Sequence, residues 1–251
     1  MIKVVFFDFY NTLVQFWPPL DQIQQAACRE FGLSVSEKGI KQGYTIADVY
    51  FNRENEIHPL ALRSEEERLE FFTRYEQMIL ENAGLLVSLD LARRVWEMAG
   101  SVPKDFMPFD DSIPALSKLQ AEGYRLGLIS NLRRDIVQLC QRLGMAKYLD
   151  YFINSAEVGV EKPDPEIFLA ALEQAAVTPE EAVHVGDQHR SDVLGARAVG
   201  IHPVLIDRGG WHPDVKDCAK IFSLTELPAI LGNAPHSLKS FHYKVQQPLD
   251  D

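Results

Sequence analysis

KVVFFDFYNTL, residues 3–13, is the stretch of this chain that most clearly indicates its fold. A short apolar run such as residues 3–7, with β-branched and aromatic side chains, is typical of a strand buried on both faces of a parallel sheet. Asp8 follows the run directly, at the carboxyl end of the predicted strand. Ligands of open parallel sheets bind at that edge, so Asp8 is a candidate nucleophile.

Similar apolar runs recur along the chain and alternate with segments of helical period. Alternating strands and helices predict an α/β fold with a Rossmann-like parallel sheet flanked by helices. Inside one of these runs, His184 is expected to pack in the core. The predicted strands are residues 3–7, 125–129, 151–153, 182–185 and 203–206.

Residues 15–105 interrupt this alternation with helical patterns and no convincing strand. Proline-rich pairs bracket the segment, which predicts an all-helical cap domain inserted after the first strand and placed as a lid over the ligand edge. We expect the core to comprise residues 1–14 and 106–232. Residues 233–251 lack a periodic pattern and are expected to form a C-terminal tail.

The charge of the chain restricts its partners. Its 251 residues carry a formal net charge of −11, and the pI is near 5.1. Such a chain repels nucleic acid and anionic lipid, so neither is expected as its main partner. A small anionic substrate would then need local positive charge or a metal. Oligomeric state stays open.

Cysteine content and apolar runs predict a cytoplasmic protein. The three cysteines lie far apart without metal-ligand spacing, which is typical of a reducing compartment. The apolar run before Asp8 is too short for a signal peptide, and no apolar stretch approaches the ~20 residues of a membrane span.

Polar residues that suit phosphate chemistry follow four of the predicted strands. A parallel sheet would gather all of them at one edge. The residues are Asp8, Ser130, Asn131, Lys162, Asp187 and Asp192.

Four stretches, FFDFYNTL, LISN, EKPDPEIF and VGDQHRSD, resemble the motifs of the haloacid dehalogenase superfamily. The resemblance spans residues 3–206, and the insert is similar to the family's first class of helical cap. It implies a hydrolase, usually a phosphatase, in which Asp8 attacks phosphorus and forms an acyl phosphate. Lys162 would neutralise the nucleophile and the transferring phosphoryl group.

The resemblance also implies a magnesium site. Asp8, Asp187 and the backbone carbonyl of Tyr10 would be oxygen ligands of Mg²⁺, and Asp192 would complete or orient the metal shell.

Phosphate contacts follow from the same resemblance. Ser130 and Asn131, with nearby backbone N–H groups, would hold phosphate oxygens, and the Tyr10 side chain could hydrogen-bond to substrate.

Tyr10 departs from the phosphatase pattern, which has a second aspartate at this position. That aspartate would protonate the leaving oxygen and later activate water, help worth ~10²–10⁴-fold in rate. A phenol with an unperturbed pKa near ~10 is a poor base at neutral pH. Asn11 is less troubling, because asparagine tolerates left-handed turn geometry.

Three functions remain open. The first is a slow Mg²⁺-dependent phosphatase, or one that prefers acyl or aryl phosphates. The second is a metal-free 2-haloacid dehalogenase, a class that carries tyrosine at the position of Tyr10. Phe168, at a place where dehalogenases carry tyrosine, and the acidic loop at Asp187 fit that class poorly. The third is a weakened relative that binds a ligand or a protein partner.

Overall fold

The computed structural model describes residues 1–58 and 60–232. The chain forms two compact units. The first, called the core unit, comprises Met1–Gln15 and the residues from Phe106 on; the second, called the cap unit, is Phe16–Asp105. The expected tail, residues 233–251, lies outside the described residues.

A six-stranded parallel sheet forms the centre of the core unit, in the order β5-β4-β1-β6-β7-β8. The prediction of an α/β core with a parallel sheet is thus confirmed. The strands are β1 (Val4–Phe7), β4 (Arg125–Ser130), β5 (Tyr151–Asn154), β6 (Ala182–Gly186), β7 (His202–Ile206) and β8 (Ala219–Ile221).

The central strand β1 pairs with β4 on one side and with β6 on the other, with Phe7 opposite Leu128 and Val185. The carboxyl ends of these three strands therefore lie side by side. All residues of β1 and β6 are buried, as expected for strands covered on both faces.

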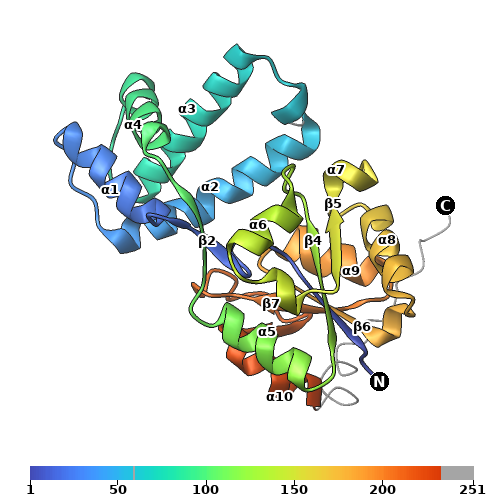
Figure 1. The fold of residues 1–251 in the computed structure, drawn as a ribbon. Helices are drawn as coiled ribbons and strands as arrows, with labels where there is room; N and C mark the ends of the chain where they lie inside the picture. Colours follow the sequence, from blue (N-terminus) through green and yellow to red (C-terminus); the bar gives the residue numbers. More distant parts are fainter. Residues whose placement is uncertain (59, 233–251) are drawn as a thin grey trace. The chain divides into compact units, whose positions relative to one another are not determined.

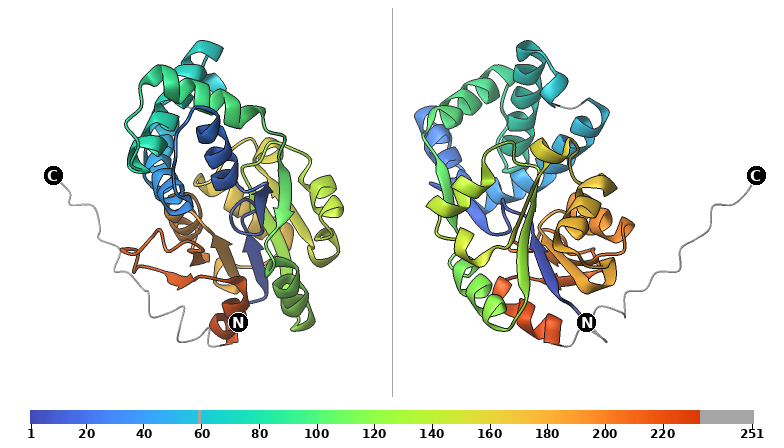
Figure 2. Two further views of the ribbon diagram at one scale, coloured as in Figure 1. Left: turned by 90° about the vertical axis from the view of Figure 1, so that its left-hand side faces the viewer. Right: turned by 45° about the vertical axis from the view of Figure 1, so that its right-hand side comes forward.

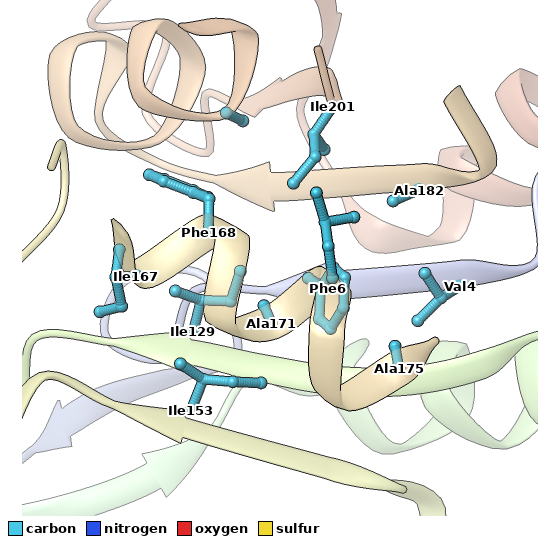
Figure 3. Packing of buried hydrophobic residues seen from close by; sticks show 12 residues of the cluster. Val4, Phe6, Ile129, Ile153, Ile167, Phe168, Ala171, Ala175, Ala182 and Ile201 are labelled. Carbon is cyan, nitrogen blue, oxygen red and sulfur yellow. The ribbon is translucent and has the colours of Figure 1, made fainter. Parts of the chain in front are cut away.

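Helices cover both faces of this sheet (Figures 1 and 2). On one face, Ile167 and Phe168 of α8 pack with Phe6 of β1 and Ile129 of β4 (Figure 3). The α-helices of the core unit are α5 (Ser112–Ala121), α6 (Ile136–Arg142), α7 (Ser155–Val158), α8 (Pro165–Ala175), α9 (Gly195–Ala198) and α10 (Leu227–Gly232). Tighter turns lie at η2 (Ala146–Tyr148), η3 (Pro179–Glu181) and η5 (Leu224–Glu226), and η4 (His189–Leu194) is a short π-helix.

A second, two-stranded sheet was not predicted. It joins β2 (Val14–Trp17) and β3 (Asp105–Pro108), where the chain enters and leaves the cap unit. The expectation that residues 15–105 hold no strand was therefore wrong at both ends of the segment.

Between these strands, the cap unit is helical. Its helices are α1 (Leu20–Glu30), α2 (Glu37–Ile57), α3 (Glu65–Asn82) and α4 (Leu89–Ser101), with a short turn at η1 (Leu60–Leu62). Ser64 and Glu67 form a capping box at the start of α3, as their spacing predicts. A Cβ at Gly43 would stand 2.2 Å from the backbone oxygen of Ile79, so glycine lets α2 and α3 approach closely. None of the helices in the described residues is long and apolar enough to span a membrane.

A buried carboxyl group lies inside the cap unit. Glu76 of α3 is 2% exposed and accepts a hydrogen bond from the side-chain amide of Gln24. The side-chain oxygen of Gln24 accepts a hydrogen bond from the Tyr44 hydroxyl at 3.3 Å. Burial raises the pKa of Glu76 to about 8. Glu76 is therefore mainly protonated at neutral pH.

We predict that Glu76 makes the protein less stable as pH rises. Its pKa is about 8 in the folded state against an ordinary value of 4.5 for glutamate, so the folded state binds the extra proton between these values. The free energy of unfolding then falls by about 1.4 kcal/mol per pH unit across this window. Glu76→Gln, which stays neutral, should show a smaller drop in melting temperature from pH 5 to pH 8 than the wild type. Glu81→Gln, an exposed change on the same helix, should behave as wild type; equal drops in all three proteins would refute the assignment.

Candidate functional site

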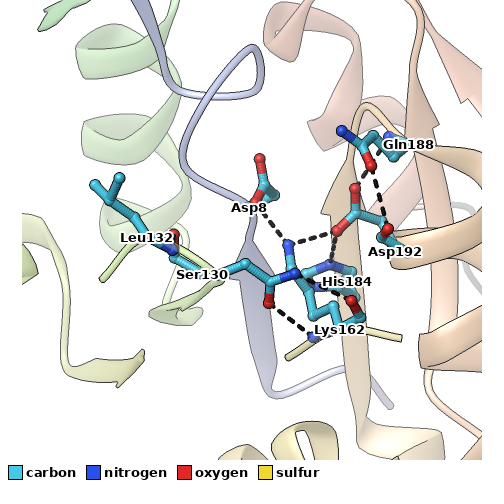
Figure 4. A network of polar contacts seen from close by, with 9 residues as sticks. Asp8, Ser130, Leu132, Lys162, His184, Gln188 and Asp192 are labelled. Atoms are coloured by element: carbon cyan, nitrogen blue, oxygen red, sulfur yellow. Dashed lines mark hydrogen bonds and ion pairs between the residues drawn. The ribbon is translucent and has the colours of Figure 1, made fainter. Parts of the chain in front are cut away.

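The Lys162 ammonium connects two carboxylates at the carboxyl edge of the sheet (Figure 4). Its Nζ lies 2.6 Å from Asp8 Oδ1 and 2.6 Å from Asp192 Oδ1. Asp8 directly follows β1, and its backbone N–H donates to the carbonyl of Val185 in β6. Three segments far apart in sequence therefore meet at one buried cation.

Asn131 fixes the backbone of Lys162. Its Nδ2 donates to the Lys162 carbonyl at 3.0 Å, and its Oδ1 accepts from the Lys162 N–H at 2.7 Å. This pair of bonds favours a positioning role for Asn131 over the direct substrate contact that was predicted. Ser130, buried at the end of β4, accepts a hydrogen bond from the Leu132 N–H at 3.2 Å, which leaves its own O–H able to donate.

Protein donors surround the Asp192 carboxylate. Oδ1 accepts from Lys162 and from His184 Nε2 at 2.9 Å, and Oδ2 accepts from the Gln188 N–H at 3.0 Å. The π-helix η4 turns this side chain back toward β6, where a Cβ on Gly186 would stand 2.1 Å from Asp192 Cγ. Glycine at position 186 thus makes room for the carboxylate, and the three donors suit Asp192 to orient its neighbours.

Charges in the site shift several pKa values. Burial and the negative charges of Asp8 and Asp192 raise the pKa of Asp187 well above its usual range. Burial also raises the pKa of Asp8, despite Lys162. Burial acts in the same direction on Asp192, but Lys162 and His184 outweigh it and hold its pKa below the ordinary value. The cluster therefore contains more buried negative charge than Lys162 balances.

Asp8, Asp187 and Asp192 each offer a carboxylate oxygen, and these oxygens lie within 4.8 Å of one another. Oxygen-only donor sets suit Mg²⁺, Ca²⁺ or Mn²⁺ rather than softer metals. A divalent cation would also compensate the charge that raises the pKa of Asp187. The residues present therefore fit the predicted magnesium ion.

Tyr10 lies in the turn that follows Asp8. Its ring meets the ring of Phe106 edge-on, with 6.1 Å between centroids, and its side chain is partly exposed. Asn11 has φ 60°, a left-handed conformation that asparagine tolerates better than most residues.

His184 and Gln188 are site residues that sequence reasoning missed. His184 is fully buried in β6 and contacts the Phe168 ring edge-on at 5.3 Å, as a core histidine does. Burial lowers its pKa, so it is neutral and donates from Nε2 to Asp192. The interaction with Asp192 depends on the π-helix, for which a sequence carries no clear signal.

The chain is similar to known proteins in sequence and in fold. A family model described as haloacid dehalogenase-like hydrolase matches residues 2–200. The chain is 30% identical to the human haloacid dehalogenase-like hydrolase domain-containing protein 3, over 82% of each chain. It is 28% identical to a ribulose-1,5-bisphosphate 5-phosphatase of Halopiger xanaduensis, over 82% of this chain and 85% of that protein. It is also 28% identical to the solved 2-haloacid dehalogenase of Pseudomonas syringae, with a TM-score of 0.53 over 93% of this chain and 100% of the other.

We predict that Lys162 is required for stability when no metal is bound. Lys162→Met leaves buried Asp8 and Asp192 without their shared counter-charge, and removing one partner of such a buried pair costs about 3 kcal/mol or more. Urea unfolding at pH 7 with EDTA measures this loss. The additional change Asp192→Asn should restore part of it, whereas the exposed control Lys216→Met should stay within about 0.5 kcal/mol of wild type. A loss below about 1 kcal/mol for Lys162→Met would contradict the assignment.

Proposed function

Because the chain belongs to the haloacid dehalogenase-like hydrolase family, we propose that it is a Mg²⁺-dependent phosphatase of a small phosphorylated metabolite. One observation carries the proposal: oxygens of Asp8, Asp187 and Asp192 lie within 4.8 Å of one another, with Lys162 on two of the three carboxylates. The similarity to a ribulose-1,5-bisphosphate phosphatase supports a phosphate ester as substrate.

Asp8 is the proposed nucleophile. One of its carboxylate oxygens attacks phosphorus, the bond from phosphorus to the leaving oxygen breaks, and an aspartyl phosphate forms on Asp8. Water then attacks phosphorus, which releases phosphate and restores the carboxylate. Bound Mg²⁺ would lower the repulsion between the Asp8 carboxylate and the phosphate.

The surrounding residues orient and compensate charge. Lys162, held by Asn131 and Asp192, presents its ammonium to the nucleophile and to the incoming phosphate. The Ser130 hydroxyl is placed to donate to a phosphate oxygen. Asp187 is the proposed metal ligand beside Asp8, and the Tyr10 carbonyl is the proposed backbone ligand.

Tyr10 limits the substrates that such a site hydrolyses well. Without a carboxylic acid at this position, the leaving oxygen departs with little proton transfer from the protein. Acyl and aryl phosphates have leaving groups that tolerate this, so they are the proposed preferred substrates, and alkyl phosphates should turn over slowly.

A second function, 2-haloacid dehalogenation, is favoured by Tyr10 and by the similarity to the Pseudomonas syringae enzyme. In that reaction Asp8 attacks carbon and halide leaves without a proton. Two contacts disfavour it. Asp187 stands beside Asp8, where a metal-free reaction on an anionic substrate gains nothing from another carboxylate. The second is Phe168, which is fully buried against His184 and has no hydroxyl at the place where dehalogenases carry tyrosine.

Metal removal and Asp8→Asn should each abolish phosphatase activity. We expect hydrolysis of acetyl phosphate and p-nitrophenyl phosphate with Mg²⁺, and a loss of at least about 10³-fold in kcat with EDTA or in Asp8→Asn. The loss with EDTA should reverse when Mg²⁺ is added back. Turnover of L-2-chloropropionate that survives EDTA would instead establish the dehalogenase.

Tyr10→Asp should restore the missing acid. We expect kcat for an alkyl phosphate to rise at least tenfold, a partial recovery of the ~10²–10⁴-fold that general acid–base catalysis supplies, with little change for acetyl phosphate. Tyr10→Asn is the matched control, because it removes the same bulk without supplying a proton. An equal rise in both variants would show that the ring obstructs substrate and that the acid is not what is missing.

A further inference from the structure

The turn that follows Asp8 is held by residues from the other side of the cap insertion. Within the turn, the N–H groups of Leu13 and Val14 donate to the Phe9 carbonyl at 2.9 and 3.0 Å. The Leu13 carbonyl accepts from the Phe109 N–H at 3.1 Å and from the buried Ser112 hydroxyl at 2.7 Å. The position of the turn thus depends on partners about 100 residues away in sequence.

Arg208, just after β7, provides a further contact with this turn. Its Nη2 donates to the Thr12 carbonyl at 2.8 Å. The same guanidinium forms a two-pronged ion pair with Asp111, at 3.0 and 2.9 Å, and lies 3.9 Å from the centroid of the Phe109 ring. Planar pairing of this kind fixes the orientation of an arginine more strictly than a single hydrogen bond does.

Asp111 is itself held in place. Beyond Arg208, it accepts hydrogen bonds from the Ser223 hydroxyl at 2.7 Å and from the Leu224 N–H at 2.9 Å. Both side chains of the pair are largely buried, with 20% of Arg208 and 13% of Asp111 exposed. The pair therefore joins three segments of the core unit to the one turn that separates Asp8 from the cap.

We propose that Arg208 and Asp111 are positioning residues for Asp8. They touch neither substrate nor metal in this proposal; they hold the Thr12 carbonyl, and through the turn they keep the Asp8 carboxylate and the Tyr10 carbonyl in place. The inference rests on the proposed function of Asp8 as nucleophile. Small displacements of a reacting group cost large factors in rate, about 10²-fold for 1 Å.

The first test measures the turn itself, without substrate. Hydrogen exchange of a peptide covering residues 8–16 reports the N–H groups of Leu13 and Val14. In Arg208→Gln this exchange should be at least tenfold faster than in wild type, and Asp111→Asn should act in the same direction. Arg125→Gln is the control. Arg125 lies at the start of β4, the end of the strand away from the site, and donates to the Tyr151 hydroxyl and to the Ala175 carbonyl. Its replacement should leave the exchange at residues 8–16 unchanged.

The second test measures catalysis with p-nitrophenyl phosphate and Mg²⁺. In Arg208→Gln, kcat should fall about tenfold or more while KM stays within twofold, because substrate groups are untouched and only the nucleophile moves. Arg208→Lys keeps the charge but loses the two-pronged pairing, so its kcat should fall in part. The double variant Arg208→Gln/Asp111→Asn should be no slower than the worse single variant, because both changes break the same Arg208–Asp111 pair that orients the guanidinium on the Thr12 carbonyl.

The outcomes separate this inference from the proposed function. Unchanged exchange at residues 8–16 in Arg208→Gln, or faster exchange with unchanged kcat, overturns the positioning role. A wild type that hydrolyses no phosphate ester overturns the proposed function, and this is established before any variant is made. In that event the exchange measurement still decides whether Arg208 holds the turn.

Discussion

The structure of the site depends on one buried ion pair network, in which Lys162 Nζ lies 2.6 Å from carboxylates of both Asp8 and Asp192. A buried ammonium is unfavourable unless anions compensate it. Two carboxylates at hydrogen-bond distance do so, and they hold the pKa of Lys162 above its ordinary value despite burial. The sheet must therefore bring its central strands, the Lys162 loop and the π-helix to one point.

The fold meets this requirement through strand order. Because β1 lies between β4 and β6, the residues at the carboxyl ends of these three strands meet at one edge, and each contributes a different group. Asp8 supplies the carboxylate, Asn131 fixes the Lys162 backbone, and Gly186 leaves room for Asp192. A divalent cation would then balance the remaining negative charge around Asp187.

Local sequence patterns predicted much of this architecture. The five strands of the core that were expected are present, and the capping box at the start of α3 follows from the spacing of Ser64 and Glu67. The three-residue strand β8 was missed because Lys220 interrupts its apolar pattern. The helical character of residues 37–57, which form α2, agrees with the expected helical cap.

Contacts between distant segments lay beyond sequence reasoning. Arg208 pairs with residues 97 and 196 positions away, and no spacing rule connects them. His184 was expected only to pack, yet it also donates to Asp192. Its second interaction requires the π-helix, and a single extra residue in a turn has no pattern in hydrophobicity. The role of each predicted site residue in catalysis stays a prediction until it is measured.

The central claim, that Asp8 attacks phosphorus, is tested most directly by the mass of the peptide that contains Asp8. Wild-type protein would be mixed with acetyl phosphate and Mg²⁺, quenched in acid during turnover, digested and compared with Asp8→Asn. The account predicts one phosphoryl group on the Asp8 peptide of the wild type and none on the variant. Phosphate release with no phosphoryl group on that peptide would contradict the claim. A separate incubation with L-2-chloropropionate and EDTA would also contradict it if the carbon skeleton of that substrate were found on the Asp8 peptide.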